Sequence, residues 1–371
     1  MTIGVLGGGQ LGHMIALAGQ ALGQRFLFLD PNRASPAQHA GTLRTGAYDD
    51  EACLEDLARD SAVVTYEFEN VPLGSAQFLA ARVPVHPPPA ALEASQDRLV
   101  EKTFLGRIGI ATPPFAPVST REELEDAVAR IGLPAVLKTR RLGYDGKGQR
   151  VLRTAADLEL AWRALGTAPL ILEGFVPFAC ELSLLSVRSV NGETRFWPLV
   201  ENEHRDGILR VSRPRSAAWT PELQARAEAA ATRVLEELAY VGVLALELFM
   251  MPDGSLLANE MAPRVHNSGH WTIEGAETSQ FENHVRAILG LPLGSTRVLG
   301  PCAMINAIGA LPPPEVVLAV DGAHLHAYGK DPAPGRKLGH VTVRAATEEE
   351  LDAKVALLLP VVDPEAVTTS S

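Results

Sequence analysis

Two glutamates in the third quarter of the chain have the type and spacing to bind a metal ion. They lie in VLALELFMMPDGSLLANEM (243–261), where Asp253-Gly254 is a strong signal for a two-residue turn between two strands. With these residues at the centre of the turn, Glu247 and Glu260 face each other, their Cβ atoms about 4.5–5.5 Å apart. Facing carboxylates repel unless a cation lies between them, and hard oxygen ligands suit Mg²⁺. The alternatives are two solvated surface acids or a register displaced by one residue, but both strands are apolar, which favours the metal.

A basic, glycine-rich stretch, KTRRLGYDGKGQR (138–150), has the composition of a phosphate-binding lid. It carries five basic residues and one acid, and Lys138 and Lys147 could neutralise phosphate. Its glycines allow the backbone to approach a ligand closely: Gly143, Gly146 and Gly148. The stretch therefore predicts a flexible hairpin over a triphosphate, with a solvated basic turn as the alternative.

A second basic stretch lies near the C-terminus, in YGKDPAPGRKLGH (328–340). In a chain that is acidic overall, Lys330, Arg336 and Lys337 indicate a phosphate clamp. A solvated C-terminal loop remains the alternative.

The segment LILEGFVPFACELSL (170–184) combines apolar residues with two acids. Glu173 and Glu181 lie at the two ends of this stretch. The free edge of a strand beside Phe175 and Val176 is what an adenine ring requires, and the carboxylate further along can bind a ribose hydroxyl. Surface acids beside an ordinary strand would give the same pattern.

A polar loop, EMAPRVHNSGHW (260–271), follows directly after the second predicted metal ligand. Loops beside a site carry function more often than loops elsewhere. Arg264, His266 and Asn267 next to a metal indicate that this loop handles an anion.

The opening residues, MTIGVLGGGQLGHM, contain a dinucleotide-binding pattern. Gly7, Gly9 and Gly12 form G-x-G-x-x-G, and Asp30 lies where a second strand should end. The pattern alone reports only a tight strand-to-helix turn, whose N–H groups bind any phosphate or anion. We expect the loop to line a substrate site, with no dinucleotide bound.

A pair of acids follows a later strand, in TYEFENV (65–71). Period-two alternation places Glu67 and Glu69 on one face, with Tyr66 and Phe68 on the other. The carboxyl end of a strand is where open α/β sheets bind ligands.

The elements that position these residues alternate between strands and helices, which indicates an α/β fold with a parallel N-terminal sheet. The proline-rich run HPPPAAL (86–92) marks a boundary, and Ser119 or Thr120 begins a helix with a capping box. The expected strands are 2–6, 25–29, 62–67, 83–85, 135–139, 149–153 and 170–176. The expected helices are 10–22, 96–108, about 120 onward, 155–165 and 221–239.

Length and composition narrow the possible functions. The 371 residues suggest two or three domains, and a net charge of −11 argues against an extended nucleic-acid footprint. The three cysteines lie too far apart in the sequence to suggest a disulfide framework or a metal site. No signal peptide is evident, and the longest uncharged run, Val298–Pro314, is interrupted by glycine and proline. We therefore expect a soluble, cytoplasmic protein that does not bind membranes.

Taken together, the motifs resemble the ATP-grasp superfamily, and within it most closely the N5-carboxyaminoimidazole ribonucleotide synthetase family. They occur in family order along nearly the whole chain: GVLGGGQLG, TYEFENVP, QDRLVEKTFL, KTRRLGYDGKGQ, EGFVPFACELS, ENEHRDGILR, NEMAPRVHNSGHWT and GRKLGH. Two positions depart from the pattern. His13 stands where the family usually has arginine, and Ala262 where many ATP-grasp enzymes have asparagine, so phosphate and water oxygens would complete the metal shell.

The resemblance implies a site with four parts. The ATP site would comprise Arg98, Lys138, Tyr144, Asp145, Gly146, Lys147, Gly148, Glu173, Gly174, Phe175, Val176, Glu181, His204, Asn259 and Glu260. The ribonucleotide site would comprise Gln10, Leu11, Glu67, Tyr144, Lys147, Lys330 and Arg336. Catalysis would depend on Arg264, His266, Asn267, Lys330 and Asp145, and Mg²⁺ would be held by Glu247 and Glu260.

The resemblance also implies an architecture and an activity. A Rossmann-like pre-ATP-grasp domain (1–95) would precede an ATP-grasp small lobe (96–175), a large lobe (176–297) and a small C-terminal domain (298–371). The enzyme would be a ligase of de novo purine biosynthesis that uses ATP and bicarbonate to carboxylate 5-aminoimidazole ribonucleotide through carboxyphosphate. It would be a homodimer and would pass its product to a mutase.

Three other functions compete with this one. An ATP-grasp ligase acting on a related ribonucleotide, for instance with formate, would share most of these motifs. An NAD-dependent oxidoreductase would explain only the opening glycines and Asp30. A nucleotide-binding module without activity would not need the residues for turnover.

Overall fold

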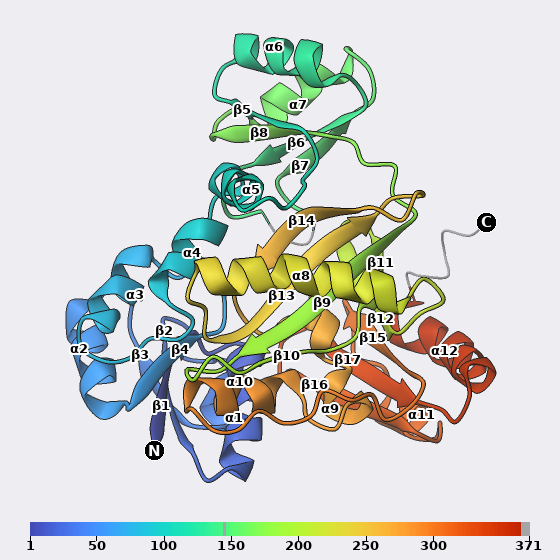
Figure 1. Cartoon of the computed structure of the whole chain (residues 1–371). Helices are drawn as coiled ribbons and strands as arrows, with labels where there is room; N and C mark the ends of the chain where they lie inside the picture. Colours follow the sequence, from blue (N-terminus) through green and yellow to red (C-terminus); the bar gives the residue numbers. More distant parts are fainter. Residues whose placement is uncertain (144–145, 365–371) are drawn as a thin grey trace.

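The computed structural model of the chain describes residues 1–143 and 146–364, and the strands within these ranges form three sheets. One sheet lies in the N-terminal part, one forms a small lobe that stands apart, and one runs through the centre of the molecule (Figure 1). Helices and strands alternate in the first half of the chain, so the predicted α/β fold is confirmed. No helix among the described residues is long and apolar enough to cross a membrane.

The N-terminal sheet is parallel throughout, as predicted, with strand order β3-β2-β1-β4. Its apolar strands are buried because helices cover a parallel sheet on both faces. The strands are β1 (Thr2–Leu6), β2 (Arg25–Asp30), β3 (Thr42–Thr45) and β4 (Val63–Tyr66). The helices of this part are α1 (Gln10–Ala21), a short 3₁₀ helix (Pro36–His39), α2 (Glu51–Asp60) and α3 (Leu73–Ala80). The predicted strand 83–85 is reduced to a single bridge between Val64 and Val85.

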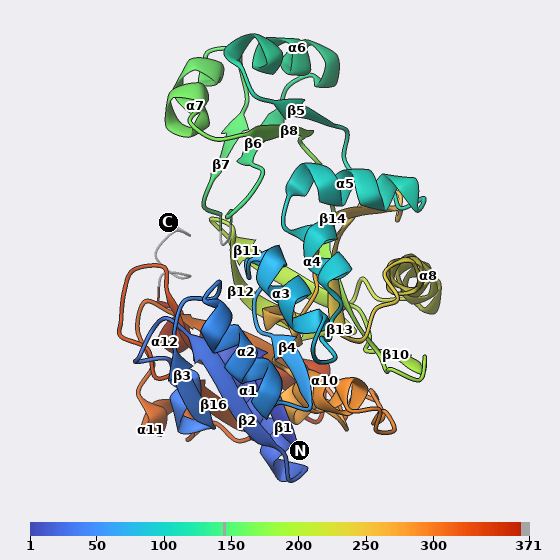
Figure 2. The same cartoon turned by 90° about the vertical axis from the view of Figure 1, so that its left-hand side faces the viewer.

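The small lobe is a four-stranded antiparallel sheet with order β5-β8-β6-β7. Its strands are β5 (Phe115–Val118), β6 (Ala135–Thr139), β7 (Gln149–Leu152) and β8 (Leu170–Gly174). Helices α6 (Arg121–Ile131) and α7 (Asp157–Leu165) cover the face turned away from the rest of the molecule (Figure 2). The Thr120 side chain accepts a hydrogen bond from Glu123 N, and the Glu123 carboxylate accepts one from Ser119 N. Thr120 is therefore the cap of the helix, whereas the return bond of the predicted capping box goes to Ser119.

The central sheet has nine strands, with β10 beside β9 and the others in the order β14-β13-β9-β11-β12-β15-β17-β16. The strands are β9 (Cys180–Arg188), β10 (Thr194–Phe196), β11 (Val200–Arg205), β12 (Ile208–Pro214), β13 (Gly242–Met250), β14 (Leu256–Ala262), β15 (Cys302–Ile308), β16 (Ala323–Ala327) and β17 (Lys337–Arg344). The helices of this part are α8 (Pro221–Glu237), a 3₁₀ helix (Asn267–Gly269), α9 (Thr272–Gly275), α10 (Gln280–Ile288), α11 (Pro314–Val317) and α12 (Glu348–Val362).

The C-terminal segment continues the central sheet instead of building a sheet of its own. Strand β15 pairs with β12 through Val211 opposite Ile305, and β17 and β16 follow outward. Helix α12 packs beside these strands, and the buried pair Arg210–Asp363, 2.7 Å apart, connects the end of this helix to β12. The strand that leads into the YGKDPAPGRKLGH loop is thereby attached to the body of the molecule.

The apolar cores show which parts of the molecule pack together. One cluster joins the N-terminal sheet to the central sheet, since Phe28 of β2, Val243 of β13 and Val285 of α10 belong to it. The small lobe has a separate core around Leu137 and Leu172. Two helices, α4 (Pro89–Ser95) and α5 (Arg98–Arg107), connect the N-terminal sheet to the small lobe. The proline-rich run is not an unstructured linker, because its Pro89 is the first residue of α4.

Candidate active site

The two glutamates face each other as predicted, but the turn that joins their strands differs. Glu247 on β13 pairs with Glu260 on β14, whereas nearer the turn Met250 pairs with Leu256, one residue out of the predicted register. The turn is longer than two residues, since Met251 N donates to Ser255 O. A bulge at Asn259 then restores the register. The facing pair is therefore confirmed, and the two-residue turn was wrong.

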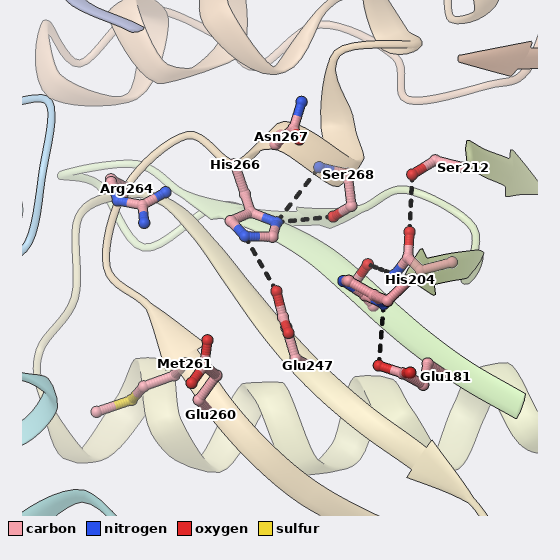
Figure 3. A network of polar contacts seen from close by, with 12 residues as sticks. Glu181, His204, Ser212, Glu247, Glu260, Met261, Arg264, His266, Asn267 and Ser268 are labelled. Carbon is pink, nitrogen blue, oxygen red and sulfur yellow. Dashed lines mark hydrogen bonds and ion pairs between the residues drawn. The ribbon is translucent and has the colours of Figure 1, made fainter. Parts of the chain in front are cut away.

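Each of the two carboxylates already has a nitrogen-bearing side chain of the protein beside it. Arg98 Nη1 lies 2.6 Å from Glu260 Oε2. His266 Nε2 lies 3.0 Å from Glu247 Oε1 (Figure 3). Burial would raise the pKa of Glu260, but the Arg98 guanidinium outweighs it and holds that pKa below its ordinary value. Repulsion between the carboxylates thus does not by itself require a metal. Among the described residues, no group of three or more His, Cys, Asp and Glu could hold one unaided.

The predicted adenine hinge lines a cleft of about 330 Å³. Aromatic side chains close one side, with the Phe178 and Phe249 rings stacked at 4.9 Å between centroids. The lining residues are Pro113, Val136, Lys138, Glu173, Gly174, Phe175, Val176, Phe178 and Phe249. The structure therefore brings together Lys138 and the whole of the predicted segment 173–176.

Glu173 is the buried acid of this cleft. Its Oε2 lies 3.0 Å from Lys138 Nζ and 3.3 Å from Lys102 Nζ, and the side chain is almost inaccessible. Burial would raise the pKa of Glu173, but the two ammonium groups keep it below its ordinary value. Its Oε1 is buried and accepts no hydrogen bond from any residue in the described ranges. One carboxylate oxygen is thus oriented by the two ammonium groups, and the other is buried without a partner among the described residues.

Glu181 and His204 form a second pair beside this cleft. Nδ1 of His204 lies 3.0 Å from Oε2 of Glu181, and a bulge at Arg210 of β12 shifts the register opposite His204. Burial would lower the pKa of His204, but the Glu181 carboxylate raises it above its ordinary value. The predicted contact of Glu181 with a ribose stays a prediction.

A second, polar cleft of about 500 Å³ lies between the start of the glycine-rich lid at Leu142 and Gly143, the end of β14 and the loop after it. Arg98, Arg140 and Arg264 line it together with Glu69, Glu260 and His266. Arg264 forms an ion pair with Glu69, so the polar loop is tied to the N-terminal part. Three guanidinium groups line this cleft beside Glu260, a predicted metal ligand. Such a cleft can bind a small anion.

Within the polar loop, His266 and Asn267 face different ways. Nδ1 of His266 accepts a hydrogen bond from Ser268 N, which leaves the proton on Nε2, facing Glu247. Asn267 points away from the two carboxylates and exchanges amide hydrogen bonds with Asn306 of β15, at 2.7 and 3.0 Å (Figure 3). The structure thus brings Arg264 and His266 to the cleft, whereas Asn267 ties the loop to the C-terminal strands.

The glycine-rich opening loop is occupied by the chain's own carboxylates. Glu67 accepts hydrogen bonds from Gly9 N and Gly12 N, and Asp30 accepts one from Gly8 N at 2.7 Å. Burial raises the pKa of Glu67, although these N–H groups favour its charged form. A phosphate would have to displace both acids, which argues against a dinucleotide. The predicted Gln10 and Leu11 lie in the first turn of α1, beside this loop.

The remaining predicted residues come from two loops. Lys330 lies near enough to Glu67 for its charge to lower the pKa of that carboxyl. The Nζ of Lys330 is 6.0 Å from the centre of the Tyr328 ring. The exposed Arg336 donates to Asp331 O within its own loop. Tyr144 and Asp145 lie outside the described residues.

The described part of the lid touches the large lobe. Gly146 has a φ of +74°, and a Cβ there would overlap the carbonyl oxygen of Asp206 in the β11–β12 turn. Gly148, with a φ of +73°, packs its backbone against the Thr139 side chain. Lys147 lies between them and is exposed. These glycines are therefore needed for close approach as well as for backbone conformation.

The sequence reasoning missed several residues that shape these clefts. Glu101 and Lys102 follow Arg98 at three and four residues, the spacing of one helix face, and that signal was available. Gln280 could not have been found, because its amide holds both the N–H and the C=O of His266 from a helix distant in sequence.

Comparisons with known proteins agree with this geometry. Three family models match: "Ribonucleotide synthetase preATP-grasp domain" (1–96), "ATP-grasp domain" (103–281) and "Phosphoribosylaminoimidazole carboxylase C-terminal domain" (302–354). The N5-carboxyaminoimidazole ribonucleotide synthase of Pseudomonas aeruginosa is 55% identical over 96% of this chain and 98% of its own. The crystal structure of N5-carboxyaminoimidazole ribonucleotide synthetase from Thermus thermophilus has a TM-score of 0.93 at 55% identity, covering 97% and 98% of the two chains. A synthase from Aspergillus clavatus, solved with ADP and 5-aminoimidazole ribonucleotide, has a TM-score of 0.91 at 32% identity, with 98% coverage of both chains.

Proposed function

The chain belongs to the N5-carboxyaminoimidazole ribonucleotide synthase family, and on that premise we propose that it carboxylates 5-aminoimidazole ribonucleotide with ATP and bicarbonate. The reaction forms a C–N bond and serves de novo purine biosynthesis. The observation that carries the proposal is the facing pair Glu247–Glu260, because Glu260 lines the polar cleft together with Arg98 and Arg264.

ATP would lie across the two clefts. Its adenine fits the apolar cleft beside Phe175 and Val176, where the free oxygen of Glu173 can accept a hydrogen bond from the base. Glu181 would bind the ribose, oriented by His204. The phosphates would extend toward Lys138, Arg98 and the lid, Gly146–Gly148, with Tyr144 and Asp145 included on the resemblance alone.

Mg²⁺ fits the residues between the clefts. Glu247 and Glu260 present oxygen ligands from neighbouring strands, and the buried Oδ1 of Asn259 receives no hydrogen bond from the described residues. When bound, the ion would offset negative charge on the phosphates. Arg98 and His266 hold the two carboxylates in place before the ion arrives.

Bicarbonate would bind in the polar cleft, near Arg264 and His266. One of its oxygens attacks the γ-phosphorus of ATP, the bond from that phosphorus to the bridging oxygen breaks, and carboxyphosphate and ADP form. The exocyclic amine of the ribonucleotide then bonds to the carbon of carboxyphosphate, or of CO₂ released from it, as phosphate leaves and the amine loses a proton. A closed lid prevents water from hydrolysing carboxyphosphate.

The ribonucleotide would lie between the opening loop and the C-terminal loop. Glu67 and Lys330 already lie near each other there, and Gln10, Leu11, Lys147 and Arg336 would complete the site. Lys330 and Asp145 would act in catalysis, and Asn267 would fix the polar loop. We further propose a homodimer whose product passes to a mutase.

The proposal is tested by measuring ADP release from MgATP with bicarbonate, with and without the ribonucleotide. Strong stimulation by the ribonucleotide, lost when formate replaces bicarbonate, supports it. Stimulation that depends on formate instead would point to a related ATP-grasp ligase. ADP release at the same rate with and without the ribonucleotide would mean that 5-aminoimidazole ribonucleotide is not the acceptor.

A further inference from the structure

Helix α5 braces the strand that carries Glu260. Arg98 Nη1 contacts Glu260 Oε2 at 2.6 Å, the Glu101 carboxylate accepts a hydrogen bond from Met261 N at 2.6 Å, and Lys102 Nζ donates to Asn259 O at 2.7 Å. Three residues on one face of the helix thus hold three consecutive residues of β14. Helix α5 lies beside β14 in Figure 1. The helix fixes this strand at the bulge that brings Glu260 opposite Glu247.

Lys102 also reaches into the small lobe. Its side chain is completely buried, and its Nζ lies 3.3 Å from Glu173 Oε2 at the end of β8. Burying an ammonium group costs free energy unless charged or polar partners surround it. The Lys102 ammonium contacts the Asn259 carbonyl and the Glu173 carboxylate, which belong to different lobes.

These lobes have separate apolar cores. Phe104 and Leu105 of α5 pack in the core of the large lobe with Leu244 and Leu182, whereas the small lobe packs around Leu137 and Leu172. Lobes with separate cores can move relative to each other. The Lys102–Glu173 pair is therefore a polar link between them: Glu173 lines the apolar cleft, and Glu101, the neighbour of Lys102 on α5, lines the polar cleft.

We propose that Lys102 is a positioning residue that sets the distance between the nucleotide hinge at Glu173 and the metal-binding strand at Asn259-Glu260. We do not place it in contact with a substrate, because its side chain is fully buried and lines neither cleft. It acts by orienting one oxygen of Glu173, which leaves the other for the base, and by anchoring the Asn259 backbone. This inference rests on the proposed function for the identity of the nucleotide.

The test compares Lys102→Met with Lys354→Met. Lys354 is a matched control, since it also donates to a backbone carbonyl, Arg344 O at 3.1 Å, and pairs with a glutamate, Glu350, far from the clefts. Calorimetry without Mg²⁺ measures the Kd for ADP, and steady-state kinetics measure KM for each substrate. We expect K102M to weaken ADP binding about ten-fold, because a charged hydrogen-bond partner is lost, and to leave KM for the ribonucleotide unchanged. K354M should leave both unchanged.

A double-mutant cycle separates positioning from a general loss of stability. Because Lys102 acts through Glu173, K102M should weaken ADP binding much less in a Glu173→Gln background. If K102M does not fold, Lys102→Gln keeps a donor for Asn259 O without the charge and takes its place in the cycle. Wild-type ADP binding in the folded variant, additive effects in the cycle, or an equal rise in KM for the ribonucleotide would each overturn the proposal. A wrong acceptor would appear separately, as ADP release that ignores the ribonucleotide in the unsubstituted chain.

Discussion

Acid should destabilise the fold through a histidine buried between the N-terminal and central sheets. His284 of α10 is inaccessible to solvent; its Nδ1 accepts a hydrogen bond from Val243 N at 3.2 Å, and its Nε2 lies 2.9 Å from Thr65 Oγ1. A proton on Nδ1 would face the N–H of Val243, so the ring must stay neutral. Burial, together with the nearby His86, lowers the pKa of His284 from 6.5 to about 3.

The sign and size of the effect follow from that shift. Between pH 6.5 and about 3 the unfolded chain binds a proton at this position and the folded chain does not, so stability falls as the pH falls. The contribution of neutral His284 to the free energy of unfolding is fully present above pH 6.5. Below that pH the free energy of unfolding decreases by about 1.4 kcal/mol per pH unit. At about pH 4.5 the loss is about 2.7 kcal/mol, a large part of the 5–15 kcal/mol typical of proteins.

Urea denaturation at several pH values from about 7.5 to 4.5 measures this slope. His284→Gln should lower the free energy of unfolding at neutral pH. It should also reduce the slope of that free energy against pH by about 1.4 kcal/mol per pH unit, the value for one proton. Thr65→Val is the control, because it removes the hydrogen-bond partner but keeps the titrating ring, so the slope should remain. His270 and His340, whose pKa values burial also lowers, continue to contribute in both variants. An unchanged slope in H284Q would refute the reasoning.

Four further predictions concern the site. Glu67→Ala should lower the free energy of unfolding by about 1–3 kcal/mol in urea, because Gly9 N and Gly12 N lose their acceptor, and an unchanged value would contradict that role. Glu260→Ala should abolish turnover, whereas full activity would exclude it as a metal ligand. Gly146→Ala should raise the fraction of ADP released without carboxylated product, because the added Cβ meets Asp206 and keeps the lid from closing; unchanged coupling would argue against this contact. Lys330→Ala should raise KM for the ribonucleotide and leave the Kd for ADP as it is, and an unchanged KM would remove Lys330 from the phosphate clamp.

Local sequence patterns predicted the elements well where one physical preference dominated. The apolar run of β1, the proline at the start of α8 and the cap at Thr120 each depend on residues within a few positions of one another. The pairing of Glu247 with Glu260 was predicted from a turn that the structure does not form. The prediction held because the longer turn and the bulge at Asn259 shift the register in opposite directions.

The rest of the site depends on contacts between distant segments, which local patterns do not report. Alternation predicted that Glu67 and Glu69 lie on one face of a strand, but β4 ends at Tyr66. Glu67 therefore contacts the opening loop, and Glu69 pairs with Arg264 instead. Lys102 reads in the sequence as an ordinary helix lysine, and its burial follows only from the approach of β8 and β14. The opening glycines indicated a phosphate site because the sequence does not reveal that Glu67 and Asp30 fill it.

The most direct test of the account is the fate of the oxygens of bicarbonate. The chain would be incubated with MgATP, 5-aminoimidazole ribonucleotide and bicarbonate labelled with ¹⁸O, and the inorganic phosphate would be analysed by mass spectrometry. If bicarbonate attacks the γ-phosphorus, each phosphate released carries one labelled oxygen. Phosphate without label, formed while the ribonucleotide is carboxylated, would contradict the account.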